Sequence, residues 1–270
     1  MMTTDTPEHT RRRLKEAAGW TAVAVTAGVA GIWGGGIHMD LMNLAMRVFA
    51  LFGPEVLPFR FEPVPAAIRL GCAAGAVYMG WRMVRMRRAE QGRCARCGVG
   101  DRPRRDRRRL ARRAAYLSIL PASCYSLLKV HWALGGTVGI ADPSVMGEVD
   151  LFSPGFLDTA IMAVVGIGVA LGMTHRWRLP RVVLLVPALI GLAMLVPVSV
   201  VGNLGNVVSL FITGDHVLGL AAWTTWFVYA CFTVWAVCLL IVTGEYAIAT
   251  AGACRSCGRR RHGEHDRIAG

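Results

Sequence analysis

Charged side chains are scarce in this chain, and lysine is almost absent. Charged residues make up 17% of the 270 positions, whereas hydrophobic residues make up 54%. The only lysines are Lys15 and Lys129, so arginine supplies nearly all of the basic charge behind a net charge of +13. A composition this poor in charge excludes an ordinary soluble domain and indicates a protein that lies within a lipid bilayer.

The chain also lacks the short motifs that mark the common classes of enzyme. It contains no P-loop, no G-x-S-x-G, no H-E-x-x-H and no strand followed by a dinucleotide-binding glycine pattern. Their absence favours a protein that is not an enzyme. A membrane enzyme can still build its site from scattered residues, so that interpretation stays open.

Apolar runs long enough to cross a bilayer occur six times along the chain. Each run is continuous rather than alternating, which predicts helices and not the strands of a membrane barrel. A crossing helix needs about 20 residues. The sequence therefore predicts an all-α transmembrane helical bundle with six spans, at residues 17–36, 65–84, 114–134, 157–173, 182–201 and 223–243.

The placement of the arginines predicts how this bundle is oriented in the cytoplasmic membrane. Residues 82–113 hold fourteen arginines against three acidic residues, whereas residues 137–156 and 202–222 hold no arginine or lysine. Positive loops remain on the cytoplasmic side, so both termini are expected there. The predicted organisation is a cytoplasmic tail at 1–16, a membrane domain at 17–250 with an arginine-rich loop at 85–113, and a cytoplasmic tail at 251–270.

Two motifs of one pattern, C-x-x-C-G, lie in polar segments on the predicted cytoplasmic side. Cys94 and Cys97 follow the second span, and Cys254 and Cys257 follow the sixth. Two such turns can present four thiolates in a tetrahedron, which is the preferred shell of structural zinc. Because the cytoplasm is reducing, these thiols favour metal binding over structural disulfides. The sequence thus predicts a four-cysteine zinc site.

Other interpretations of these cysteines stay open. Thiol redox switching and unligated thiols are two of them. A third is a ligand set within the tail alone, in which His262 and His265 join Cys254 and Cys257. That set leaves less loop between its ligands than zinc modules usually have, which favours the two-loop set of four cysteines.

Ionisable residues within or beside the predicted spans form a second candidate site, toward the outer halves of the helices. Charge inside a membrane is a functional candidate by default. In one interpretation Arg69 or Lys129 pairs with Asp158 in a small polar cavity. In the other, the basic side chains extend to the headgroups and Asp158 caps its helix. The residues of this candidate site are Arg69, Lys129, His131, Asp158, His38 and Asp40.

The stretch that starts at Lys129 carries a family resemblance. It reads K-V-H-W-A-L-G-G and ends at Gly136, so Trp132–Gly136 is similar to the W-A-L-G-G signature of an uncharacterised family of small bacterial multi-helix membrane proteins. The resemblance implies a membrane protein of about four helices and no established activity. This chain departs from the family by its extra spans and its cysteine pairs, so no functional residue is carried over.

These observations favour a non-enzymatic scaffold, sensor or assembly factor with a cytoplasmic zinc site. The alternatives are a small-solute or ion transporter that uses the outer-half charges, and a membrane-embedded enzyme built on His38, His131 and Asp158. The expected partners are anionic lipid headgroups at the arginine-rich loop, and also a protein. Nucleic acid is disfavoured because the loop lacks interleaved aromatic residues for base stacking.

Overall fold

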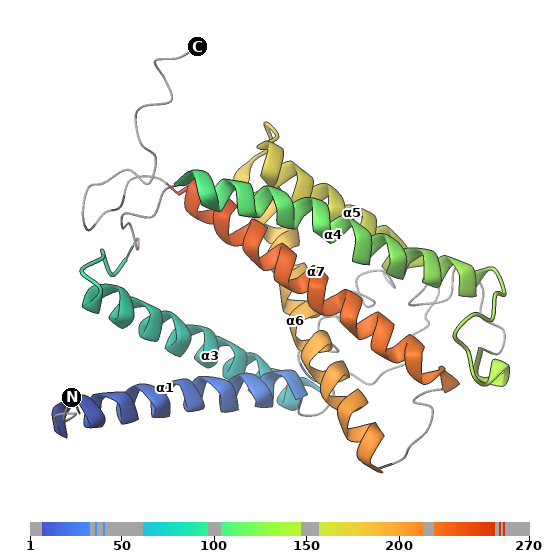
Figure 1. Ribbon diagram of the computed structural model, residues 1–270, viewed down its shortest axis with the longest axis horizontal. Helices are drawn as coiled ribbons and strands as arrows, with labels where there is room; N and C mark the ends of the chain where they lie inside the picture. Colours follow the sequence, from blue (N-terminus) through green and yellow to red (C-terminus); the bar gives the residue numbers. More distant parts are fainter. Residues whose placement is uncertain are drawn as a thin grey trace, which may run out of the picture. The chain divides into compact units, whose positions relative to one another are not determined.

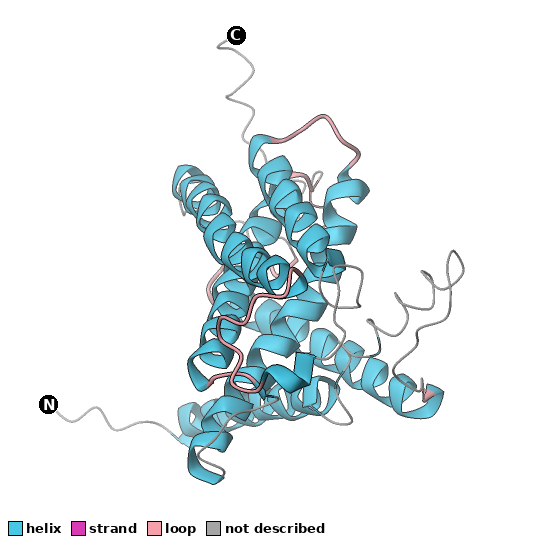
Figure 2. Ribbon diagram, turned by 90° about the vertical axis from the view of Figure 1, so that its right-hand side faces the viewer, coloured by secondary structure: helices cyan, strands magenta, loops and turns pink. Residues whose placement is uncertain are grey.

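The structure is a computed structural model in which the described part of the chain is helical. It describes residues 7–32, 36, 40, 62–96, 104–146, 157–212, 219–251, 254 and 256. Within these ranges there are six α-helices, one short 3-10 helix and no strand (Figures 1 and 2). The prediction of an all-α protein is confirmed, and each predicted span corresponds to one helix. The elements are α1 (Pro7–Ile32), α3 (Pro63–Glu90), α4 (Arg104–Ala133), η2 (Pro143–Met146), α5 (Leu157–His175), α6 (Arg181–Ile212) and α7 (Ala222–Ala249).

Contacts divide the chain into two compact units. The first comprises Met1–Arg102 together with Gly252–Gly270, and the second comprises Pro103–Ala251. The end of the chain therefore belongs to the same unit as α1 and α3, although it follows α7 in the sequence.

The first unit is built on α1 and α3, which lie side by side in opposite directions (Figure 1). The buried positions of α3 are Arg69, Ala76 and Met83, which are seven residues apart and form one stripe along the helix. Met83 packs on Gly19 of α1, where an added Cβ would lie 2.8 Å from the Met83 sulfur. The outward face of α3 keeps apolar side chains exposed, including Val77 and Trp81.

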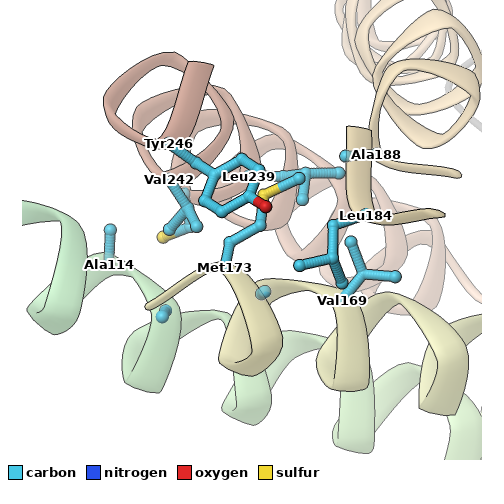
Figure 3. Close-up of a cluster of buried hydrophobic side chains, with 11 residues drawn as sticks. Ala114, Val169, Met173, Leu184, Ala188, Leu239, Val242 and Tyr246 are labelled. Carbon is cyan, nitrogen blue, oxygen red and sulfur yellow. The ribbon is translucent and has the colours of Figure 1, made fainter. Parts of the chain in front are cut away.

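The second unit contains the four α-helices α4, α5, α6 and α7. α7 contacts α4, α5 and α6, and α5 contacts α4 and α6. Figure 3 shows the core, in which Met173 of α5 lies among Leu184 of α6 and Leu239 and Tyr246 of α7. Small residues such as Ala114 line the facing side of α4, which lets the helices approach closely.

Among the described residues, two helices are long and apolar enough to cross a membrane. They are α6 over Arg181–Val208 and α7. The apolar part of α5, Thr159–His175, is shorter. These helices support a membrane protein, whereas the other four predicted crossings stay a prediction.

Candidate metal centre

The first CxxC motif begins directly after a well-defined helix end. Gly92 adopts a φ of +66°, a left-handed conformation that glycine takes without a steric penalty. The N–H of Gly92 donates to the carbonyl of Ala89 at 3.1 Å, and the N–H of Arg93 donates to that of Arg88 at 2.9 Å. This pair of bonds is a Schellman motif. It ends α3 and turns the chain so that Cys94 follows two residues later.

Cys94 meets a cysteine from the far end of the chain. Its Sγ atom lies 3.9 Å from the Sγ of Cys254, a residue 160 positions later in the sequence. Cys254 is buried and Cys94 is partly buried. Both residues belong to the first unit. The fold thus brings together one cysteine from each of the two motifs.

The distance between the two sulfurs distinguishes between the chemical states of this pair. A disulfide requires about 2.05 Å between its sulfur atoms, so the separation of 3.9 Å excludes that bond here. In a tetrahedral zinc site with Zn–S bonds of about 2.3 Å, two sulfurs are separated by about 3.8 Å. The observed 3.9 Å matches the edge of that tetrahedron. The pair therefore fits the spacing of two ligands of one zinc ion.

The remaining predicted ligands, Cys97, Cys257, His262 and His265, lie outside the described residues. Within the described part of the chain, no group of three or more histidine, cysteine or acidic side chains is placed to hold a metal ion. The complete ligand set therefore remains a prediction.

Arg69, a member of the second candidate site, forms a buried ion pair with Asp40. The Arg69 Nε donates to Oδ2 of Asp40 and Nη2 donates to Oδ1, both at 2.6 Å. The side chains are 6% and 14% exposed, so the pair is removed from solvent. This two-bond arrangement matches the planar guanidinium to a carboxylate. It joins the segment after α1 to α3.

Lys129 and His131 lie in the second unit and make contacts near the C-terminal end of α4. The Lys129 ammonium lies over the rings of Tyr125 and Trp132, 5.9 and 5.4 Å from their centroids. These distances are in the range of cation–π attraction. Nε2 of His131 accepts a hydrogen bond from the N–H of Val138 at 3.3 Å. His38 and the side chain of Asp158 lie outside the described residues, so the predicted pairing with Asp158 stays a prediction.

The W-A-L-G-G stretch has a clear structural role. Trp132 is buried, and its indole N–H donates to the carbonyl of Val138 at 2.8 Å. Gly135 ends the helix with a φ of +84°. The ring of His131 packs so closely on Gly136 that a Cβ there would collide with it. This motif therefore builds the tight turn that leaves α4.

The loop after this turn is held against the start of α7. The hydroxyl of Thr224 donates to the carbonyl of Gly139, and the N–H of Ala141 donates to that of Gly219, both at 2.9 Å. Farther along, Asp142 accepts hydrogen bonds from the N–H and hydroxyl of Ser144, which lower the pKa of that carboxyl. Hydrogen bonds to Gly219 and Thr224 thus hold the loop that follows α4 in place.

A polar contact that the sequence pattern did not predict joins α6 and α7. The Asn203 amide donates to the hydroxyl of Thr233 at 2.9 Å and to the carbonyl of Ser199 at 2.6 Å. A hydrogen bond between helices is a common way to fix their register in a membrane. The sequence signal was Asn203 itself, one of two asparagines in a mostly apolar helix.

Comparison with protein-family models, with curated proteins and with solved structures finds no match for this chain.

Proposed function

We propose that the chain is a multi-pass protein of the cytoplasmic membrane with six spans and a structural zinc site on its cytoplasmic side. The ligands are Cys94, Cys97, Cys254 and Cys257. A closed shell of four thiolates leaves no open position for catalysis, which favours a scaffold, sensor or assembly factor over an enzyme. The observation that carries the proposal is the 3.9 Å approach of Cys94 to Cys254 across 160 residues.

The membrane location is supported by how little of the apolar helices is buried. In the most apolar stretch of α6, 22% of the residues are buried, and in that of α7, 39% are buried. The core helix of a soluble protein buries most of such a stretch. Apolar surface this extensive needs lipid or another partner to cover it. Exposed apolar side chains of α6 include Val182, Leu189, Ile190, Val200 and Leu204.

The zinc ion would supply a fixed connection between two distant parts of the chain. It would link the turn after α3 to the segment after α7, and both are expected in the reducing cytoplasm, where thiols stay available as ligands. Arg93 and Arg96 flank Cys94 in the sequence and can offset the negative charge of four thiolates. A connection of this kind suits a protein that holds its inner face in one arrangement.

The proposal is tested by the metal content of the purified full-length protein. Plasma mass spectrometry is applied to the wild type and to Cys94→Ser and Cys254→Ser. We expect about one zinc per chain in the wild type and its loss in both variants, because removal of one ligand from a closed shell weakens the whole site. Cys72→Ser is the matched control, since Cys72 is a free cysteine of the same unit within α3.

Each outcome bears on the proposal. Zinc that is lost in both variants and retained in the Cys72 control supports one shared site. A wild type that carries no metal, with its thiols shown to be reduced, refutes the zinc site. Zinc that is lost from Cys254→Ser alone points to the ligand set within the tail.

A transporter is the second candidate, and the Arg69–Asp40 pair is the observation that favours it. Arg69 lies in a proposed span, and a buried charge of this kind is a common feature of ion and proton pathways. The test reconstitutes the protein into vesicles and applies a pH gradient. A fluorescent indicator trapped inside the vesicles then reports whether protons or cations enter. Flux that disappears in Asp40→Asn and persists in Cys94→Ser would favour transport over a scaffold.

A further inference from the structure

The outward face of α4 changes from basic to apolar along the helix. At 100° per residue, Arg109, Arg112 and Arg113 lie on the same side as Tyr116 and the leucines that follow. The three arginines are exposed, and Tyr116 is 50% exposed. The leucines on this side, Leu117, Leu120 and Leu127, are 52%, 64% and 69% exposed.

The opposite side of α4 is buried against other helices of the second unit. Ala111, Ala114, Ala115 and Ser118 are buried at 5% exposure or less. Small side chains there allow close packing on α5 and α7. The face that begins at Arg109 and ends at Leu127 is therefore the one left for an external partner.

The arginines of this face have no acidic partner among the described residues. By contrast, Arg87 of α3 pairs with Glu16 of α1, and Arg85 lies 4.4 Å from the ring centroid of Trp81. These two arginines of α3 are thus engaged within their own unit. Arg109, Arg112 and Arg113 present their charge outward.

Polar groups of the neighbouring helices gather at the same end of the second unit. The hydroxyl of Tyr116 lies 3.1 Å from Nε2 of His175, the last residue of α5. At the start of α6, Arg181 donates to the carbonyl of Ala247 in the last turns of α7 at 3.2 Å. All four helices therefore pass from polar to apolar residues near one level.

The length of α4 beyond its arginines matches a bilayer. Between Arg113 and Ala133 the helix rises about 30 Å, which is the thickness of the hydrocarbon region. Tyrosine at the boundary suits the headgroup level, where amphipathic rings gather. The arginines then lie at the depth of the lipid phosphates.

We propose that Arg109, Arg112 and Arg113 form a binding surface for anionic phospholipids of the cytoplasmic leaflet, with the phosphates held by the guanidinium groups and the acyl chains along the leucine face. The inference rests on the proposed membrane location and does not depend on the zinc site. Arginine suits this role because its planar fork donates two hydrogen bonds to a phosphate.

The experiment compares the full-length wild type with two triple variants. In the first, Arg109, Arg112 and Arg113 are all changed to Gln, and in the second, all are changed to Lys. The glutamine variant keeps eleven of the fourteen arginines of residues 82–113, since 14 − 3 = 11, so its orientation is expected to persist. Phosphatidylglycerol is titrated into each protein in detergent micelles that contain phosphatidylcholine. Native mass spectrometry then counts the phosphatidylglycerol molecules that stay bound.

We expect phosphatidylglycerol to bind at least about tenfold more weakly to the glutamine variant, because each basic residue near an anionic surface contributes severalfold to binding. The lysine variant retains most of the preference because it keeps the charge. As a second readout, vesicles with phosphatidylglycerol raise the unfolding temperature of the wild type and not that of the glutamine variant.

The outcomes separate this inference from the membrane proposal. Flotation tests the membrane location with two kinds of vesicle, one of phosphatidylcholine alone and one that also contains phosphatidylglycerol. If the wild type floats with both kinds but all three proteins retain phosphatidylglycerol equally, the lipid-binding surface alone is overturned. Wild type that floats with neither kind overturns the membrane location as well. Tight binding of a single-stranded oligonucleotide at physiological salt, without lipid preference, assigns the arginines to nucleic acid and overturns the proposal.

Discussion

Removal of one partner of the Arg69–Asp40 pair is expected to destabilise the first unit strongly. The two side chains are 6% and 14% exposed and share two hydrogen bonds of 2.6 Å. Asp40→Asn keeps the shape of the acceptor and leaves the Arg69 charge buried without its counter-ion. Arg69→Met leaves the Asp40 carboxylate in the same position. Each change should lower the free energy of unfolding by about 3–5 kcal/mol.

The double variant Arg69→Met/Asp40→Leu should be far less destabilised than either single variant predicts. Replacing both charges by apolar groups removes the desolvation cost together with the attraction, so its net effect should stay within about 2 kcal/mol of the wild type. The coupling energy between the two sites is then at least about 4 kcal/mol, because the single effects total about 6–10 kcal/mol and the double variant costs about 2 kcal/mol at most.

The measurement is equilibrium unfolding of the full chain in mixed micelles with increasing SDS, followed by far-ultraviolet circular dichroism. Arg69→Lys is a graded control, because an ammonium keeps the charge and loses the planar two-bond geometry. Single effects that add within about 0.5 kcal/mol in the double variant would refute the reasoning. So would single effects below about 1 kcal/mol, which are typical of an exposed pair.

Two further predictions concern packing and the thiols. Gly166→Ala should destabilise the second unit by about 1–3 kcal/mol, since its Cβ would lie 2.7 Å from Cζ2 of Trp235, whereas Gly168→Ala meets open space and should not. Thermal unfolding of both variants checks this, and equal unfolding temperatures would contradict it. After zinc chelation and mild oxidation, non-reducing peptide mass spectrometry should find a Cys94–Cys254 disulfide, because the sulfurs start 3.9 Å apart. Recovery of both cysteines unlinked would argue against their proximity.

The helices were predictable because their signal is local. A continuous apolar run satisfies its own backbone hydrogen bonds only as a helix, and each predicted span corresponds to a helix of the structure. The helix ends were not predicted: α3 continues to Glu90, beyond the predicted span at 65–84, and is ended by the turn at Gly92, which has a positive φ.

The candidate sites were predictable only in part. The repeated C-x-x-C-G pattern predicted that the two motifs lie together, because identical ligand turns suggest a shared metal, and the structure brings Cys94 and Cys254 to 3.9 Å. Arg69 was identified as a candidate, and one interpretation paired it or Lys129 with Asp158 and placed Asp40 nearby; the structure pairs Arg69 with Asp40. The hydrogen bond of Asn203 to Thr233 gave no periodic signal at all.

The sequence by itself determined the helical class, the positions of the helices and the concentration of arginine before and at the start of α4, since these follow from composition and from backbone hydrogen bonding along one segment. Only the tertiary structure decided which face of α4 is buried, which carboxylate meets Arg69, and that the chain beyond α7 returns to Cys94. Those contacts join residues far apart in the sequence. They depend on how side chains of different helices pack together, which no local pattern encodes.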